Sequence, residues 1–342
     1  MGGAGVCGGL ALSAAMAERP PAPPLGLPLA PWPKNNPYSP AKAALGRLLF
    51  FDTRLSSDGT VACASCHDPR RAFSDRTALS EGIGKQKGVR NAMAIINRGY
   101  GRRQLWDSRA ASLEEQVKAP LADTKEMTTA DDPAEAHRLC IDRLRQIPGY
   151  RERFRKVFGA PDFTVEHVGK AIATFERTIY SGNSPYDRYR TGDVAAMTPA
   201  QVRGMELFFG KPSCMACHNP PLFTDEIPAN TGVGSESRKK AKPDLGVAEI
   251  TGNEWDRGFF RTPTLRDVAL TAPYMHDGSV KTLEEAVEHY DRGGGRNPRL
   301  DDRLQPLHLT KQEKKDLVSF LKALSGEGWQ HIRPPAAAEM PR

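Results

Sequence analysis

After its first 17 residues the sequence has no apolar run long enough to cross a bilayer, so no membrane-spanning helix is predicted. It also has little of the strict alternation of apolar and polar residues that is typical of strands. The net charge is +7, but basic residues are scattered among acidic ones, so nucleic-acid binding is not expected. These absences favour an all-α protein with no membrane span and no nucleic-acid partner.

Cysteine is also scarce. Of the six cysteines, four fall into two short motifs, Cys7 lies in the first 17 residues, and Cys140 is isolated in a stretch of helical character. No disulfide is therefore predicted in the mature chain, and Cys140 is interpreted as a small core residue.

The two motifs share the spacing Cys-x-x-Cys-His. Two thiols at this spacing can add across the two vinyl groups of one haem, and the adjacent histidine can bind its iron. A zinc site would need four Cys or His ligands around one metal, and a thioredoxin-like redox pair does not need the trailing histidine. The sequence therefore predicts two covalently bound haem c groups, attached through Cys63 and Cys66 with His67 as iron ligand, and through Cys214 and Cys217 with His218 as iron ligand.

A long-period repeat supports this interpretation. Ser39-Pro40-Ala41 opens an apolar-faced segment ahead of the first motif, and Thr198-Pro199-Ala200 opens a similar one ahead of the second. A Ser or Thr followed by Pro is typical of a helix start, so two tandem cytochrome c-like domains with long loops are predicted. The predicted parts are a leader at 1–17, a Pro-rich lead-in at 18–38, an N-terminal domain at 39–195, a C-terminal domain at 196–330 and a tail at 331–342.

Further helices are predicted from their start signals. One begins at Asp132-Pro133, and one runs from Val165 to Tyr180 behind Thr164. The last begins after Thr310, with Glu313 as its capping-box partner. The stretch between the first haem motif and Met127 is predicted to be rich in loops.

The first residues resemble a secretion signal. Residues 5–17 are small and apolar, and Ala15-Met16-Ala17 fits a cleavage site, although no Lys or Arg precedes Arg19. Because haem is attached to such motifs outside the cytoplasmic membrane, we predict a cleaved signal and a periplasmic location.

Several further motifs are shared with a known family. The chain resembles the bacterial di-haem cytochrome c peroxidase / MauG superfamily, and within it the Tyr-ligated MauG/MbnH-like branch. The motifs are Leu48-Leu49-Phe50-Phe51-Asp52, Cys66-His67-Asp68-Pro69, Arg90-Asn91, Trp106-Asp107-Ser108-Arg109-Ala110, Leu113-Glu114-Glu115-Gln116, Lys125-Glu126-Met127, Arg261-Thr262-Pro263-Thr264-Leu265-Arg266 and Ala272-Pro273-Tyr274-Met275-His276-Asp277-Gly278.

The resemblance implies roles for individual residues. It implies that the first haem performs peroxide chemistry, the second transfers electrons, and Trp106 lies between them. Gln116 and Glu126 match the residues beside the bound peroxide, where a carboxylate can move the proton during O–O cleavage. Taken alone, Trp106 could equally be a core residue and Glu126 a surface carboxylate. The resemblance also implies one calcium ion, held by Asn91, Thr271 and Pro273.

Two departures from the peroxidases indicate the subtype. Peroxidases that need reductive activation carry a histidine in the loop after the first motif, but residues 68–132 contain none. The first haem is therefore expected to have an open sixth position in its ferric form.

The second departure concerns the other haem. Tyr290 stands fourteen residues after His276, where the peroxidases place a methionine ligand. A phenolate favours ferric and higher states, whereas a thioether favours ferrous iron. Tyr290 is the predicted sixth ligand, with His289 or Met275 as alternatives, and His276 is expected to hydrogen-bond near this haem.

The leading functional hypothesis is a MauG-like di-haem oxidase. Hydrogen peroxide would generate a high-valent state shared by both haems (bis-Fe(IV)-type), which oxidises a Trp or Tyr of a periplasmic protein partner by long-range electron transfer. The exit residue stays open, with Trp255, Tyr274 and Trp329 as candidates by redox type. One alternative is an ungated cytochrome c peroxidase that takes electrons from a small cytochrome or copper protein. Another is a plain di-haem electron carrier.

Overall fold

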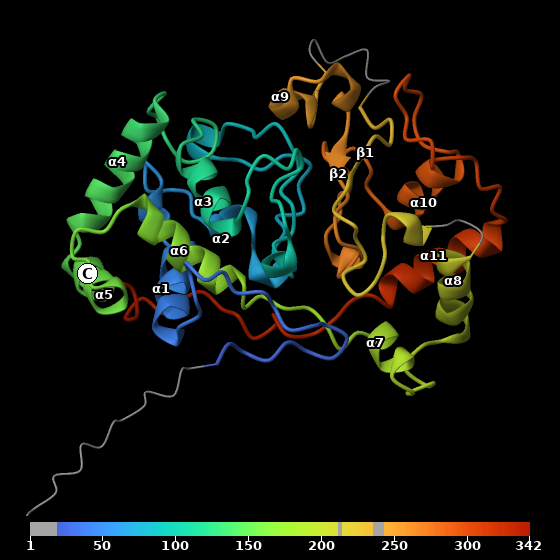
Figure 1. Ribbon diagram of the computed structural model, residues 1–342, viewed down its shortest axis with the longest axis horizontal. Coiled ribbons are helices and arrows are strands. Elements are labelled where there is room, and N and C mark those ends of the chain that lie inside the picture. Colours follow the sequence, from blue (N-terminus) through green and yellow to red (C-terminus); the bar gives the residue numbers. More distant parts are fainter. Residues whose placement is uncertain (1–18, 211–213, 235–242) are drawn as a thin grey trace, which may run out of the picture.

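The computed structural model describes residues 19–210, 214–234 and 243–342, so the predicted leader lies outside the described residues. Two separate clusters of buried apolar residues form its cores, one in each half of the chain. Figure 1 shows these halves side by side, with helices on the outside and long loops facing one another across the middle. Among the described residues, no helix combines the length and the hydropathy that a membrane crossing requires.

The N-terminal half packs its helices around the first core. These helices are α1 (Pro40–Phe50), α2 (Cys63–Cys66), α3 (Leu113–Leu121), α4 (Pro133–Arg145), α5 (Pro148–Phe158) and α6 (Val165–Glu176). Helix α1 crosses α6 at Gly46, where an added Cβ would lie 1.9 Å from the carbonyl oxygen of Ala171. Only glycine permits this close approach of the two backbones.

The C-terminal half repeats this packing. Its elements are α7 (Pro185–Arg190), α8 (Pro199–Phe209), α9 (Ala248–Thr251), α10 (Leu283–Asp291), α11 (Lys311–Lys322) and a short antiparallel pair, β1 (Pro228–Ala229) and β2 (Phe260–Arg261). Helix α8 crosses α11 at Gly204, where an added Cβ would lie 1.9 Å from the carbonyl oxygen of Asp316. The sequence repeat is therefore also a structural repeat. The crossing of α1 with α6 in the first half corresponds to the crossing of α8 with α11 in the second half.

The helix starts predicted from sequence are confirmed. Ser39 Oγ accepts a hydrogen bond from the Lys42 amide at 3.1 Å, and Thr198 Oγ1 accepts one from the Gln201 amide at 3.3 Å. Thr310 caps α11 as predicted. The prediction was wrong in two places: α6 ends at Glu176 rather than Tyr180, and α5 was not expected. The stretch up to Met127 is rich in loops as predicted, and it also contains α3.

Both ends of the described chain cross between the halves (Figure 1). In the Pro-rich lead-in, the carbonyl of Leu25 accepts a hydrogen bond from the Asn183 amide at 2.7 Å, and the buried Asn36 donates to Glu114 at 2.7 Å. After α11 the chain runs back beneath both halves, and Trp329 and Ile332 pack into the first core. These two segments fasten the halves to each other.

Candidate functional site

The loops that face one another in the middle of the molecule follow a common design. The antiparallel bridge between Gln104 and Ala110 recurs as the bridge between Tyr274 and Val280. Each bridge is followed at the same spacing by a helix, α3 in the first half and α10 in the second. Residues of the two halves can therefore be compared position by position.

The first cavity, of about 200 Å³, surrounds the first Cys-x-x-Cys-His motif. Cys63, Cys66 and His67 line it, and the Nδ1–H of His67 donates to the carbonyl of Phe73 at 3.3 Å. A backbone acceptor at Nδ1 leaves Nε2 as the ring nitrogen that is free to bind a metal. Among the described residues that line this cavity, His67 is the only histidine.

Helix α3 presents one face to the first cavity. The lining residues include Leu113, Gln116, Val117 and Pro120, which are spaced as neighbours on one side of a helix. The predicted distal residue Gln116 therefore lies in the cavity, and one turn further along stands Pro120, whose side chain carries no ligand atom.

Glu126 lines the same cavity from the loop that follows α3. Burial, and then the charge of Asp123, raise the pKa of Glu126 to about 7, while Arg109 opposes this rise. Glu126 nevertheless keeps an exposed surface. Such a carboxyl can both accept and return a proton near neutral pH.

The loop at residues 80–85, in which the sequence has no histidine, packs against the backbone of Glu126. The Ile83 amide donates to the Glu126 carbonyl at 3.0 Å, and Ile83 is buried. A Cβ on Gly82 would lie 2.0 Å from the Lys125 carbonyl oxygen. The loop thus holds the Glu126 segment in place.

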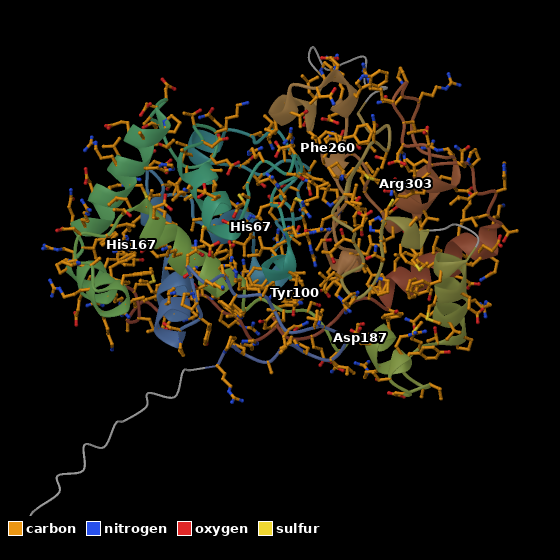
Figure 2. All side chains as sticks on the ribbon, in the orientation of Figure 1. His67, Tyr100, His167, Asp187, Phe260 and Arg303 are labelled. Atoms are coloured by element: carbon orange, nitrogen blue, oxygen red, sulfur yellow. The ribbon has the colours of Figure 1, made fainter. Side chains whose placement is uncertain are left out.

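The second cavity, of about 470 Å³, surrounds the second motif. Cys214, Cys217 and His218 line it, and the Nδ1–H of His218 donates to the carbonyl of Phe223 at 3.1 Å. The arrangement matches that of the first motif. Figure 2 shows His67 in the N-terminal half, and Phe260 and Arg303, which line the second cavity, in the C-terminal half.

Helix α10 presents to this cavity the face equivalent to that of α3. Leu283, Ala286, Val287 and Tyr290 line the cavity at the same helical spacing. His289 is not among the lining residues, and its Nε2–H donates to the carbonyl of Thr231 at 2.9 Å. The structure therefore favours Tyr290 over His289 as a ligand from this helix.

Two other predicted residues also line the second cavity. Met275 does so, which keeps it as an alternative ligand. The ring of His276 stacks on that of Phe260, with centroids 3.7 Å apart and planes at 11°. The stacking with Phe260 was not predicted from the sequence.

Trp106 lines both cavities. Its Nε1–H donates to the carbonyl of Asn91 at 2.9 Å, and its own carbonyl accepts from the Arg261 amide at 2.7 Å. At the equivalent place in the other half, the His276 carbonyl accepts from the Asn91 amide at 2.7 Å. The indole is therefore fixed at the junction of the two halves.

Ion pairs hold Asp107, the residue that follows Trp106 in the chain. Arg90 binds Asp107 from the first half and Asp244 from the second, the latter at 2.7 Å, and Arg109 also binds Asp107, at 2.6 Å. Arg90 further lies over the ring of Phe260, 5.6 Å from its centroid.

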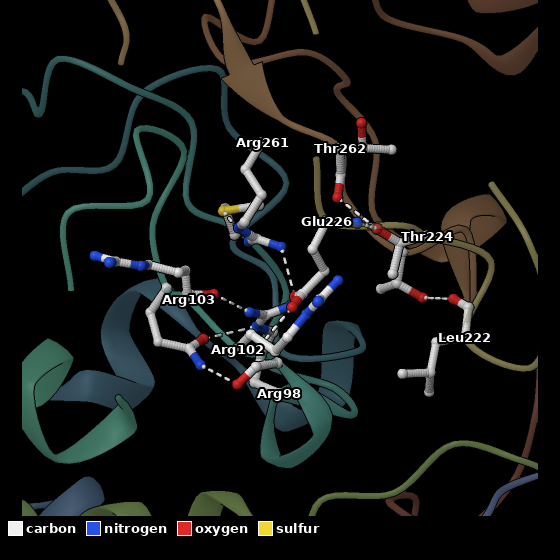
Figure 3. A network of polar contacts seen from close by, with 12 residues as sticks. Arg98, Arg102, Arg103, Leu222, Thr224, Glu226, Arg261 and Thr262 are labelled. Atoms are coloured by element: carbon white, nitrogen blue, oxygen red, sulfur yellow. Dashed lines mark hydrogen bonds and ion pairs between the residues drawn. The ribbon is translucent and has the colours of Figure 1, made fainter. Parts of the chain in front are cut away.

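A buried charge cluster between the cavities was not predicted from sequence. Arg98 and Arg261, which line both cavities, share the single carboxylate of Glu226 at 2.8 and 3.2 Å (Figure 3). Burial, and then Arg98, lower the pKa of Arg261, and although burial opposes it, the two arginines hold the pKa of Glu226 below its ordinary value. Two guanidinium groups for one carboxylate leave a buried positive charge that suits an anionic group.

The structure gives the following positions for the three predicted calcium residues. Asn91, Thr271 and Pro273 all line the second cavity. The Nδ2 of Asn91 donates to the carbonyl of Thr77 at 2.8 Å, which leaves the amide oxygen of this side chain to face elsewhere. Among the described residues, no cluster of three or more His, Cys, Asp or Glu could hold a metal, so a cation here would depend on amide and carbonyl oxygens.

The residues present fit haem in both cavities. Each cavity places two thiols and a correctly hydrogen-bonded imidazole among mainly apolar residues, and the arginine pair between them can bind carboxylate groups such as haem propionates.

Comparison with known proteins gives the same family. The family described as "Di-haem cytochrome c peroxidase" matches residues 40–195. The methylamine utilization protein MauG of Methylorubrum extorquens is 39% identical over 91% of this chain and 84% of its own length. The cytochrome c551 peroxidase of Nitrosomonas europaea is 36% identical over 90% of each chain.

Solved structures agree. A MauG-like protein associated with microbial copper homeostasis superposes with a TM-score of 0.81 and is 35% identical, over 92% of this chain and 97% of that one. The diheme peroxidase BthA from Burkholderia thailandensis shares the fold, with a TM-score of 0.73 and 24% identity, over 90% of this chain and 91% of that one. The chain therefore belongs to the di-haem cytochrome c peroxidase family, and is a di-haem c-type oxidoreductase of its MauG and peroxidase group.

Proposed function

We propose that this enzyme is a MauG-like oxidase, which uses hydrogen peroxide to oxidise a Trp or Tyr side chain of a periplasmic partner protein. One observation carries this proposal. Tyr290 stands on the cavity face of α10, whereas the equivalent place on α3 holds Pro120, which cannot bind iron. The two sites are thus built for different coordination, one open to peroxide and one closed by an anionic ligand.

The relatives support this proposal without separating it from its alternative. Similar proteins include a MauG and a MauG-like protein linked to copper homeostasis, but also cytochrome c peroxidases at comparable identity. The choice therefore rests on Tyr290 and on the first cavity.

In the first cavity, Glu126 takes the proton of the incoming peroxide and later returns it to the leaving oxygen. Its pKa near 7 suits both steps, and Gln116 supplies an amide that orients the peroxide. The haem, when bound, supplies the iron at which the O–O bond is cleaved and the electrons that this cleavage consumes. Pro120 leaves the peroxide room to bind.

In the second cavity, Tyr290 is the proposed iron ligand. Burial raises the pKa of its hydroxyl well above the ordinary value, so the phenolate forms only where a metal cation compensates for it. A hard anionic ligand disfavours the ferrous state, and a site of this kind is poorly suited to accept electrons from a small donor.

Trp106 is the proposed relay between the two sites, because it lines both cavities and is fixed by hydrogen bonds at its Nε1 and its carbonyl. A calcium ion is proposed at Asn91, Thr271 and Pro273. The carbonyl of Asn91 accepts the indole Nε1–H, so a cation bound by its side chain would also steady Trp106.

Steady-state turnover with a small electron donor tests the proposal. The native enzyme should reduce hydrogen peroxide slowly with reduced cytochrome c or a reduced copper protein, and Tyr290→Met should be faster. Turnover by the native enzyme that equals that of the methionine variant would instead favour the ungated peroxidase, the alternative to which the similarity to cytochrome c551 peroxidase points.

A further inference from the structure

Trp329 is a second tryptophan, linked to the first site through one residue, Phe73. It is 7% exposed and belongs to the first core, although it follows α11 in the chain. Its ring meets that of Phe73 edge to face, with centroids 6.2 Å apart, and the carbonyl of Phe73 accepts the Nδ1–H of the haem ligand His67. Phe73 therefore contacts both the indole of Trp329 and the imidazole of His67.

The indole has a carboxylate at its nitrogen. Its Nε1–H donates to Oδ2 of Asp267 at 3.1 Å, and the Gly326 amide donates to Oδ1 at 2.8 Å. Asp267 is fully buried. These two N–H donors are of the kind that an ionised carboxylate accepts.

The equivalent residue of the other half shows that a negative charge is not needed for the fold. Asn97 precedes the same short helical turn and has the same left-handed backbone as Asp267. Its Oδ1 accepts from the Ser181 amide at 2.9 Å, as Asp267 accepts from Gly326. A neutral amide thus performs the structural role, and the negative charge of Asp267 is present where an indole N–H meets it.

We propose that Trp329 is a proton-coupled electron donor of this enzyme, and that Asp267 accepts its Nε1 proton when the indole loses an electron. The inference rests on the proposed function, since hydrogen peroxide is the oxidant. Hydrogen peroxide first withdraws two electrons from the two haem sites, as the proposed function requires. The oxidised sites then take one electron back from Trp329, which becomes a neutral radical as its Nε1 proton passes to Asp267. An electron from the oxidisable Trp or Tyr of the partner protein later reduces the radical, and Asp267 returns the proton.

The surroundings favour this step. Burial raises the pKa of Asp267, which makes its carboxylate a better base, although its hydrogen bonds oppose the rise. Trp32 provides the opposite case, because the guanidinium of Arg177 lies over its ring, 6.0 Å from the centroid. A cation near an indole opposes removal of an electron, whereas a carboxylate favours it.

The test follows the radical that forms in the holoenzyme. Diferric protein with ring-deuterated tryptophan receives one equivalent of hydrogen peroxide without a partner, and the sample is freeze-quenched for electron paramagnetic resonance. The native enzyme should give a radical signal that deuteration narrows. Trp329→Phe should lose this signal, whereas Trp32→Phe should keep it.

Asp267→Asn reproduces the residue of the other half, so it should fold and unfold like the native protein. Its radical yield should nevertheless fall about tenfold, because a positioned proton acceptor is gone. An unchanged signal in Trp329→Phe, or an unchanged yield in Asp267→Asn, would overturn the inference. If the native ferric signals do not respond to peroxide at all, the proposed function fails instead.

Discussion

The two halves of this enzyme use one frame to build two different sites. Helices α3 and α10 follow equivalent bridges and present equivalent faces to their cavities. At one position of this face, Pro120 of α3 corresponds to Tyr290 of α10. At another position, Gln116 of α3 corresponds to Ala286 of α10. The difference teaches that a few side chains on a shared scaffold decide coordination and reactivity. The helix face at the first site offers no ligand atom at position 120, whereas the face at the second site offers the hydroxyl oxygen of Tyr290.

The largest expected effect, on the reaction with peroxide, comes from giving α3 a ligand at the position where α10 has Tyr290. Pro120→His would place an imidazole in the first cavity at the position that Tyr290 occupies in the second. The first site should become six-coordinate, and the diferric enzyme should stop reacting with peroxide. Stopped-flow absorption measures this, with Pro120→Ala, which brings no ligand atom, as the control that should still react. A histidine variant that reacts at the native rate would contradict the equivalence of the two helix faces.

The next effect concerns Glu126, the proposed base of the first site. Glu126→Gln should slow the reaction with peroxide by about 10²–10⁴-fold. Because the carboxylate form is required and its pKa is about 7, the native rate should rise with pH through about 7, and the variant should lose this rise. The exposed Glu115→Gln is the matched control. A pH profile that is unchanged in the Glu126 variant would assign the proton transfer to another group.

A smaller effect is expected on the reduction potential of the second site. Tyr290→Met should raise the reduction potential of the second site by on the order of 0.1 V, within the roughly 0.8 V that axial ligands span. Spectroelectrochemical titration measures this. Tyr290→Phe separates the loss of the ligand from the gain of a thioether, and a potential that moves in neither variant would leave Met275 as the ligand.

The smallest effect tests the frame itself. Alanine inside a helix normally stabilises it relative to glycine, but in Gly204→Ala the Cβ would meet the Asp316 carbonyl oxygen at 1.9 Å. The free energy of unfolding should therefore fall by about 1–3 kcal/mol, and Gly46→Ala should behave alike in the other half. Gly88→Ala, where the nearest atoms lie 3.8 Å away, should change it less. Denaturant titration distinguishes these outcomes.

Much of this architecture could be predicted from local sequence signals. The haem motifs and the capped helices depend on residues a few positions apart, and the structure places Gln116, Glu126, Trp106 and Tyr290 in the cavities where the resemblance expected them. Their chemical roles stay predictions.

What was missed depends on contacts between distant residues. No spacing rule reveals that Arg98 meets Glu226, which is 128 residues away, or that Trp329 returns to the first core. Helix α3 was not predicted, because nine residues with a proline at the penultimate position give a weak helical pattern. Only the comparison of α3 with α10 shows that Pro120 occupies the position equivalent to Tyr290.

Electron paramagnetic resonance of the diferric enzyme, before and after one equivalent of hydrogen peroxide, tests the central claim most directly. The account predicts a five-coordinate first site and a six-coordinate second site at rest, followed by loss of both ferric signals without added reductant. A resting enzyme with two six-coordinate sites that reacts only after receiving an electron would contradict it.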